Sequence, residues 1–325
     1  MIVMAGSGKE WRLRASLTLL MSLSVACSST DESESTTPQV VAAFYPFAFV
    51  GERIAGDHAV VTNLTPPGVE PHDLELTPGQ VVKISDADIA IYEAGFQPSV
   101  DDAIEQNPPD STLEVTEVVS LLEEPPSAES HPDEHEDDSG EFSSGDSADA
   151  PLQGDPHLWQ DPTLLIPVAE ILADELASAD PDHASDFKAN AAALVKDLRE
   201  LDSDFQTGLA SCERREIVTS HAAFGYLANR YDLTMIAIAG LSPEIEPSPE
   251  RLAEIQDLVQ SRGITTVFSE TLGSKQYADT LATDLGVTAA VLDPIEGLAD
   301  EDSDEDYLSL MRSNLEVLRE ANGCT

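Results

Sequence analysis

The chain has 325 residues, and 41% of them are hydrophobic, which is enough for two domains with cores of their own. With 16 Lys and Arg against 62 Asp and Glu, its formal net charge is −46 at pH 7. A surface so poor in cations offers no basic patch to phosphates, so we expect no nucleic-acid partner.

The first 27 residues have the pattern of an export signal. Three cations precede an apolar run, residues 15–26, which is too short to span a bilayer. The run ends at Cys27, and a polar stretch, residues 28–38, follows as a flexible tether. This junction resembles the lipobox of bacterial lipoproteins, where the mature chain begins at a lipidated cysteine, although Ser24 replaces the usual larger aliphatic residue. Plain secretion is the alternative.

From residue 39 onward, short β-rich runs alternate with segments of helical length. This alternation predicts an α/β fold of two lobes with mostly parallel sheets. The predicted strands are 40–44, 60–64 and 89–92 in a first lobe of residues 39–183, and 216–219, 235–238, 265–268 and 289–292 in a second lobe of residues 212–325.

An acidic segment, residues 123–153, interrupts the first lobe. Phe142 is the only large apolar residue between positions 123 and 151, so this stretch cannot bury enough apolar surface to offset the entropy lost on ordering. We expect a mobile loop. It contains His131 and His135, which either collect metal weakly or belong to an insert that only solvates the surface.

Residues 184–211 are predicted to form one long helix. Apolar side chains recur there at alternating spacings of three and four residues, which places them on one helical face. They are Phe187, Ala191, Leu194, Leu198, Leu201, Phe205 and Leu209. Such a helix could connect the two lobes or pack as an ordinary helix inside one of them.

Two cysteines remain if Cys27 carries lipid, namely Cys212 and Cys324. An even number of cysteines in an oxidising exterior predicts a disulfide between them. It would tie the start of the second lobe to the end of the chain.

Three histidines stand in short motifs that point to a metal site, since imidazole is the commonest protein ligand for divalent metals such as zinc. His72 and His221 follow predicted strands 60–64 and 216–219, and His157 precedes a helix that begins near residue 163. Ligands bind at the carboxyl ends of strands in open α/β sheets, so two facing lobes would bring these side chains together.

Two carboxylates follow later strands of the second lobe. Glu270 comes two residues after strand 265–268, and Asp293 comes directly after strand 289–292. Both therefore belong to the same sheet edge as His221. His58 and His183, in turn-like contexts, are interpreted as surface histidines outside the site.

The ordered motifs together resemble one family. They are Pro71-His72-Asp73, Asp155-Pro156-His157-x-Trp159-x-Asp161-Pro162, Ser220-His221-x-x-Phe224-x-Tyr226 and Leu292-Asp293-Pro294. This set, behind a lipobox-like signal, resembles the zinc and manganese solute-binding lipoproteins of bacterial ABC importers, from about residue 40 to the end. The resemblance implies two α/β lobes joined by a single long helix, with a metal held between them. It also implies a lipid-anchored monomer outside the cytoplasm that delivers metal to a permease with a cytoplasmic ATPase.

By motif position, the resemblance assigns metal-ligand roles to His72, His157 and His221, with Asp293 as the acidic fourth ligand. Glu270 matches an acidic position of the family, but Thr271 replaces the proline that follows there, so Glu270 is interpreted as a near-site residue. Whether Asp293, Glu270 or water completes the shell is left open.

Other residues of the motifs are expected to support the ligands. Asp73, Glu75 and Asp155 are close enough in sequence to accept a hydrogen bond from a ligating imidazole, which fixes the orientation of the ring. Trp159 is expected to pack against the wall of the pocket.

Three nitrogen donors and one carboxylate favour Zn²⁺, whereas Mn²⁺ prefers harder, oxygen-rich sites. Mn²⁺ and Fe²⁺ are the alternatives. Four protein ligands leave no open position for an activated water, so the sequence predicts capture of the ion without catalysis. Two rival classes are a zinc hydrolase with Glu270 as general base and an anchored adhesin with a structural metal.

Overall fold

The computed structural model describes residues 37–123, 154–300 and 304–325, which lie within a single unit, Thr36–Thr325. Cys27, His131 and His135 lie outside the described residues, together with nearly all of the predicted acidic loop. The predicted lipidation and the role of the loop therefore stay predictions.

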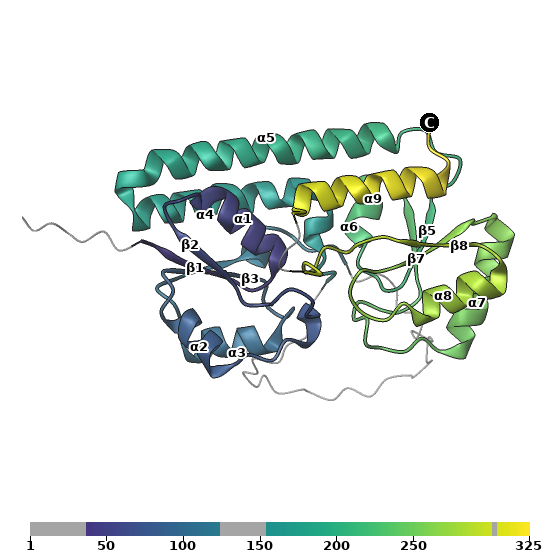
Figure 1. Ribbon diagram of the computed structural model, residues 1–325, viewed down its shortest axis with the longest axis horizontal. Helices are drawn as coiled ribbons and strands as arrows, with labels where there is room; N and C mark the ends of the chain where they lie inside the picture. Colours follow the sequence, from purple (N-terminus) through teal and green to yellow (C-terminus); the bar gives the residue numbers. More distant parts are fainter. Residues whose placement is uncertain (1–36, 124–153, 301–303) are drawn as a thin grey trace, which may run out of the picture. The chain divides into compact units, whose positions relative to one another are not determined.

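Within the described ranges the strands form two parallel sheets of four, with the orders β2-β1-β3-β4 and β6-β5-β7-β8 (Figure 1). The two sheets thus repeat one topology. The first sheet contains β1 (Gln39–Ala42), β2 (Val60–Asn63), β3 (Ile89–Tyr92) and β4 (Ser111–Glu114). The second contains β5 (Glu216–Thr219), β6 (Thr234–Ala237), β7 (Thr266–Ser269) and β8 (Thr288–Val291).

The helices are α1 (Tyr45–Ala55), α2 (Pro78–Ser85), α3 (Pro98–Gln106), α4 (Leu165–Ala179), α5 (Ala184–Gly208), α6 (Gly225–Arg230), α7 (Pro249–Arg262), α8 (Gln276–Leu285) and α9 (Tyr307–Asn322). Short 3₁₀ turns are η1 (Pro71–Asp73), η2 (Val115–Glu117), η3 (Leu158–Gln160), η4 (Pro162–Leu164) and η5 (Pro181–His183). Figure 1 shows α1 and α4 on one face of the first sheet and α2 and α3 on the other. None of the described helices combines the length and apolar character needed to cross a bilayer.

Two α/β lobes with parallel sheets and a long connecting helix were predicted, and this fold is confirmed. Each predicted strand is present within two residues of its expected bounds. The sequence missed β4, whose composition, Ser-Thr-Leu-Glu, contains only one large apolar residue, the buried Leu113. A run with a single apolar side chain has no alternation from which to recognise a strand.

The long helix α5 buries its apolar stripe against α1 and α4 of the first lobe and against α9. Its 25 residues correspond to about 38 Å at 1.5 Å per residue. Helix α9 lies beside α5 (Figure 1) and adds a second link between the lobes. Its first residue, Tyr307, packs its ring 5.3 Å from that of Phe49 and donates a hydrogen bond to the carbonyl of Trp159 at 2.6 Å.

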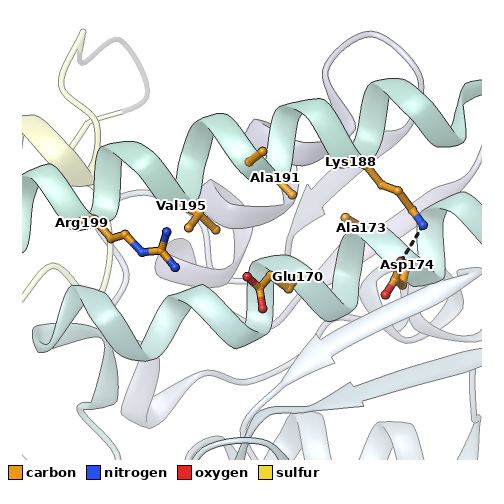
Figure 2. A pocket seen from close by; sticks show the side chains of 8 residues that line it. Glu170, Ala173, Asp174, Lys188, Ala191, Val195 and Arg199 are labelled. Atoms are coloured by element: carbon orange, nitrogen blue, oxygen red, sulfur yellow. Dashed lines mark ion pairs between the residues drawn. The ribbon is translucent and has the colours of Figure 1, made fainter.

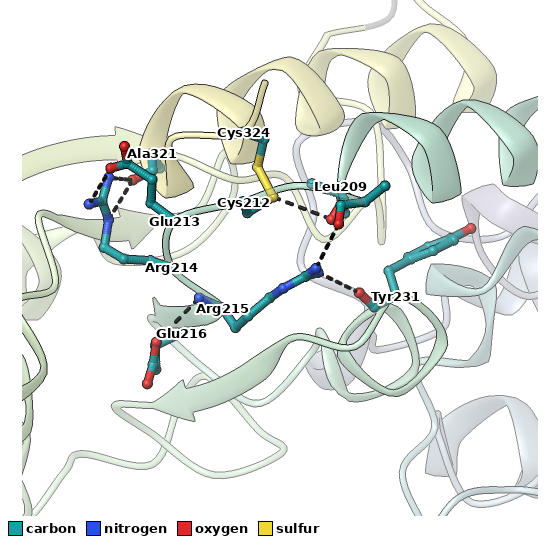
Figure 3. The surroundings of a disulfide bond; sticks show 10 residues. Leu209, Cys212, Glu213, Arg214, Arg215, Glu216, Tyr231, Ala321 and Cys324 are labelled. Carbon is teal, nitrogen blue, oxygen red and sulfur yellow. Dashed lines mark hydrogen bonds and ion pairs between the residues drawn. A yellow bond between two sulfur atoms is a disulfide. The ribbon is translucent and has the colours of Figure 1, made fainter.

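A disulfide joins Cys212, just after α5, to Cys324, just after α9 (Figure 3). This is the pair that the sequence leaves once Cys27 is set aside. The chain around the bond is held further, because the guanidinium of Arg214 donates to the carbonyl of Ala321 at 3.1 Å and the Thr325 amide donates to the carbonyl of Ser211 at 2.9 Å. The ends of α5 and α9 are thus fixed together.

Replacing both cysteines, as Cys212→Ser with Cys324→Ser, should lower the free energy of unfolding. The bond closes a loop of 112 residues, for which the chain-entropy model gives about 4–5 kcal/mol. Urea unfolding of the mature chain measures the change, with the unaltered protein in reductant as control. An unfolding midpoint equal to that of the oxidised protein would contradict a stabilising bond.

Candidate metal centre

Loops at the carboxyl edges of the strands carry most of the site. His221 follows β5 and Glu270 follows β7, and these two strands are neighbours in the sheet although β6 lies between them in sequence. Such a reversal of strand order leaves a crevice at the sheet edge, which is where open α/β sheets bind ligands. His72 lies on η1 beyond β2, and His157 directly precedes η3.

Four side chains converge there, namely His72, His157, His221 and Glu296, and one donor atom from each lies within 4.8 Å of all the others. The Nε2 atoms of the three histidines lie 3.6, 3.3 and 3.1 Å, respectively, from Oε1 of Glu296. Zinc bonds of about 2.0–2.1 Å would place ligand atoms about 3.3 Å apart at the corners of a tetrahedron. The three separations from Glu296 are therefore close to the edge length of a four-coordinate zinc shell.

Two of the histidines each have an acidic neighbour that contacts both the backbone N–H and the Nδ1 side of the ring. The Asp155 carboxylate accepts from the backbone N–H of His157 at 3.0 Å and lies 2.7 Å from its Nδ1. Glu270 accepts from the backbone N–H of His221 at 3.0 Å and also lies 2.7 Å from Nδ1 of that ring. With a carboxylate beside Nδ1, each ring has its Nε2 facing the carboxylate of Glu296, an arrangement in which carboxylates commonly support metal-binding histidines.

Two nitrogen atoms at the centre of the cluster are left without a hydrogen bond by the described residues. Nε2 of His72 and Nε2 of His157 are buried, and neither has a hydrogen-bond partner among the described residues. Buried polar atoms in proteins are nearly always paired. A cation bound between the rings would satisfy both nitrogens at once, so the donor set fits a metal ion.

Charges in the site are strongly coupled. Burial opposes the charged form of His221, but the carboxylates of Glu270 and Glu296 outweigh it and raise the pKa of His221 well above its usual value. Burial also opposes ionisation of Glu296, yet the positive charge of His221 and the polar contacts with the three imidazole rings hold the pKa of Glu296 well below its usual value. These opposite shifts favour a protonated His221 beside an ionised Glu296.

The pKa values of the other two rings, His157 and His72, are shifted in opposite directions. His157 is fully buried, which disfavours its charge, but its hydrogen bond to Asp155 and the nearby carboxylate of Glu296 raise its pKa. Burial is the main cause that lowers the pKa of His72, and Glu296 offsets it only in part. His72 is therefore the ring that is neutral most readily.

A second acidic residue, Glu70, lies beside the cluster. Burial, followed by the neighbouring charge of Glu296, raises the pKa of Glu70 to about 9. Its carboxyl group is thus protonated at neutral pH and adds no second negative charge beside Glu296.

The structure brings together three of the four predicted ligands but not the fourth. Asp293 is not among the clustered side chains, and its carboxylate accepts from Thr271 Oγ1 at 2.6 Å and from the backbone N–H of Ile295 at 2.8 Å. The carboxylate within the cluster is Glu296, three residues farther along the loop. Glu270 lies against His221 on the side away from the centre, so its near-site interpretation agrees with its position.

Of the residues expected to support the ligands, Asp155 and Trp159 lie beside His157 and the other two do not. Asp155 lies against His157, whereas Asp73 and Glu75 are exposed. Trp159 is fully buried and packs with its ring centroid 5.4 Å from that of His157.

His58 and His183 lie outside the cluster, as expected. Their rings stack on each other with centroids 3.9 Å apart, and each ring pairs with a carboxylate of its own, Asp186 and Asp180 respectively.

Sequence reasoning missed Glu296 and Glu70. Both lie beside motifs that it used, since Glu70 directly precedes Pro71-His72-Asp73 and Glu296 comes two residues after Leu292-Asp293-Pro294. The available signal was the loop beyond β8, because every acidic residue in that loop is a candidate for the sheet edge and not only the first one.

A hollow of about 500 Å³ lies elsewhere, between α4 and α5 (Figure 2). Its lining residues all come from these two helices and include an ion pair between Lys188 and Asp174 at 3.1 Å. None of the four clustered side chains lines it, so this hollow is separate from the candidate metal centre.

Comparison with known proteins finds relatives that are named for zinc binding and zinc uptake. The family described as zinc-uptake complex component A, periplasmic (ZnuA), matches residues 40–321. The zinc-binding lipoprotein AdcA of Streptococcus pneumoniae is 36% identical over 302 residues, which cover 91% of this chain and 58% of AdcA. The high-affinity zinc uptake system protein ZnuA of Bacillus subtilis is 30% identical over 324 residues, which cover 96% of this chain and 98% of that protein.

Solved structures show the same likeness. The Zn(II)-bound ZnuA-like domain of S. pneumoniae AdcA has a TM-score of 0.70 at 33% identity, covering 88% of this chain and 99% of that one. The laminin-binding protein Lmb of Streptococcus agalactiae, described as bifunctional with adhesin and metal transporting activity, has a TM-score of 0.73 at 28% identity, covering 87% and 99%. The chain spans little more than half the length of the AdcA relatives it matches, 55% to 58%.

Substituting Glu296→Gln should lower the pKa of both His221 and His157 in the metal-free protein, because the ionised carboxylate raises both. NMR titration of the imidazole nitrogens measures this change. The exposed Glu170, on α4, provides the control Glu170→Gln, which should leave both titrations unaltered. Unchanged pKa values in Glu296→Gln would contradict the electrostatic account of the site.

Proposed function

The chain belongs to the ZnuA family, and from this premise we propose that it captures Zn²⁺ outside the cytoplasm and delivers it to an ABC-type permease with its cytoplasmic ATPase. The observation that carries the proposal is the convergence of His72, His157, His221 and Glu296, whose donor atoms lie within 4.8 Å of one another. Three imidazole nitrogens and one carboxylate oxygen are a zinc-type donor set, and a manganese site would use more oxygen donors.

In this proposal Glu296 replaces Asp293 as the acidic ligand. Four protein ligands complete the shell and leave no position for an activated water, so the site stores the ion and catalyses nothing. Asp155 and Glu270 support the proposal as outer partners, because they hold the rings of His157 and His221 with Nε2 facing inward.

Position in the cell belongs to the same proposal. The protein would act as a monomer anchored to the membrane by lipid on Cys27, which keeps the captured ion close to the permease. The names of the relatives support this setting, since one is a lipoprotein and another a component of a zinc uptake system.

Replacing any one of the clustered histidines should weaken zinc binding severely. We expect His72→Ala, His157→Ala and His221→Ala each to lose more than the roughly 10- to 100-fold that removal of an outer hydrogen-bond partner costs. Competition titration with a chromophoric zinc chelator measures the dissociation constants, and titration with Mn²⁺ tests the alternative metal.

The matched controls are His58→Ala and His183→Ala, which remove a histidine without touching the cluster. Binding of zinc by all five variants as tightly as by the unaltered chain would refute the proposal. Chelation of the metal should leave circular dichroism unchanged, because the second sheet has a core of its own and the first shares its core with α5 and α9. Unfolding on chelation would favour a structural metal, as in the adhesin alternative.

Zinc affinity should rise with pH from 5 to 7.5 and continue to rise at higher pH. His221 and His157 have raised pKa values in the metal-free protein, so zinc must displace protons from their Nε2 atoms. Each proton released steepens the dependence by about tenfold per pH unit. Calorimetry in buffers of different ionisation enthalpy counts the protons released at pH 7. Equal affinity at pH 5 and 7.5 would exclude this ligand set.

A further inference from the structure

The turn that carries Glu296 has an uncommon backbone. Ile295 has φ +58°, and among the described non-glycine residues only Asp232 shares a positive φ. A β-branched residue rarely adopts this left-handed conformation, because its Cβ approaches the following carbonyl oxygen. The side chain of Ile295 is fully buried, so the turn cannot relax without withdrawing that side chain from the core.

Asp293 holds this turn from within the loop. One oxygen of its carboxylate accepts from the backbone N–H of Ile295 at 2.8 Å, and the other accepts from Thr271 Oγ1 at 2.6 Å. The side chain of Asn314, on α9, brackets the backbone of Asp293, accepting from its N–H at 2.9 Å and donating to its carbonyl at 2.6 Å. The backbone before Glu296 is therefore fixed on both sides.

Pro294, the residue after Asp293, connects this turn to the segment that carries His157. The carbonyl of Pro294 accepts from Trp159 Nε1 at 2.7 Å and from Gln160 Nε2. Both donors lie on η3, directly after His157. The segment that carries Glu296 and the segment that carries His157 are thus joined through one carbonyl group.

We propose that Asp293 is a positioning residue for the metal centre. Its carboxylate fixes the left-handed turn at Ile295, and this turn holds the Glu296 carboxylate within 3.1–3.6 Å of the three Nε2 atoms. Asp293 acts through Glu296 and does not bind the ion. This inference rests on the proposed zinc function and adds a role for a residue that touches no ligand atom.

The test compares Asp293→Asn with Asp293→Ala. Asparagine keeps an oxygen that accepts from the Ile295 amide and gains an amide that donates to the Thr271 hydroxyl, so it removes only the charge. We expect Asp293→Asn to bind zinc as tightly as the unaltered chain. Asp293→Ala should bind about 10- to 100-fold more weakly, the range for losing a group that orients a ligand. Glu296→Gln should lose more than either.

Two outcomes overturn the proposal. A loss in Asp293→Asn as large as in Glu296→Gln would mean that Asp293 binds the ion with its charge, and full affinity in Asp293→Ala would mean that the turn needs no support. If Asp293→Ala fails to fold, as judged by circular dichroism, Asp293→Asn alone still decides between a positioning residue and a ligand.

A second pair of variants, Ile295→Gly and Ile295→Ala, tests the left-handed backbone at this position. Both variants lose the buried side chain, but only glycine adopts positive φ without strain. We expect Ile295→Gly to melt at a higher temperature without metal and to bind zinc more tightly than Ile295→Ala. Equal melting temperatures would refute the strained turn. Failure of the unaltered chain to bind zinc would instead refute the proposed function, while the melting comparison would still test the turn.

Discussion

The site depends on one buried negative charge, the carboxylate of Glu296, held among three imidazoles. An ionised carboxylate withdrawn from water is costly unless positive charge or hydrogen bonds compensate it. This compensation comes mainly from the positive charge favoured on His221 and from the polar contacts with the three rings. A divalent cation could take over the same role, because it would satisfy the carboxylate and the unpaired Nε2 atoms together. A proton on His221 and a metal ion would therefore compete to compensate the same negative charge, that of Glu296.

The carboxylates around the cluster influence this competition between proton and metal, although they are not among the four clustered side chains. Asp155 hydrogen-bonds Nδ1 of His157, and Glu270 accepts from the backbone N–H of His221 and lies 2.7 Å from Nδ1 of that ring. Glu70, with a pKa of about 9, stays protonated, so that Glu296 keeps the negative charge of the pair. The charge of the site is therefore set by these local contacts and not by the net charge of −46 on the whole chain.

The scaffold holds these groups at two facing sheet edges. Helix α5 packs along α1, α4 and α9, and the disulfide fixes the ends of α5 and α9 to each other. Tyr307 and the carbonyl of Pro294 add direct contacts between segments that belong to different lobes. A frame linked at several places allows less lobe movement than a flexible hinge would, which suits a site whose ligands come from both halves.

The sequence by itself determined the alternation of strands and helices, the long apolar stripe of α5 and the three histidine motifs, because each of these is encoded in neighbouring residues. It could not choose between Asp293 and Glu296. That choice depends on a left-handed Ile295, which local preferences disfavour and which Asn314 and Trp159 support from distant parts of the chain. The partnership of Glu270 with His221 likewise required β5 and β7 to be neighbours. Only tertiary structure decides such features, since their causes are contacts between residues far apart in sequence.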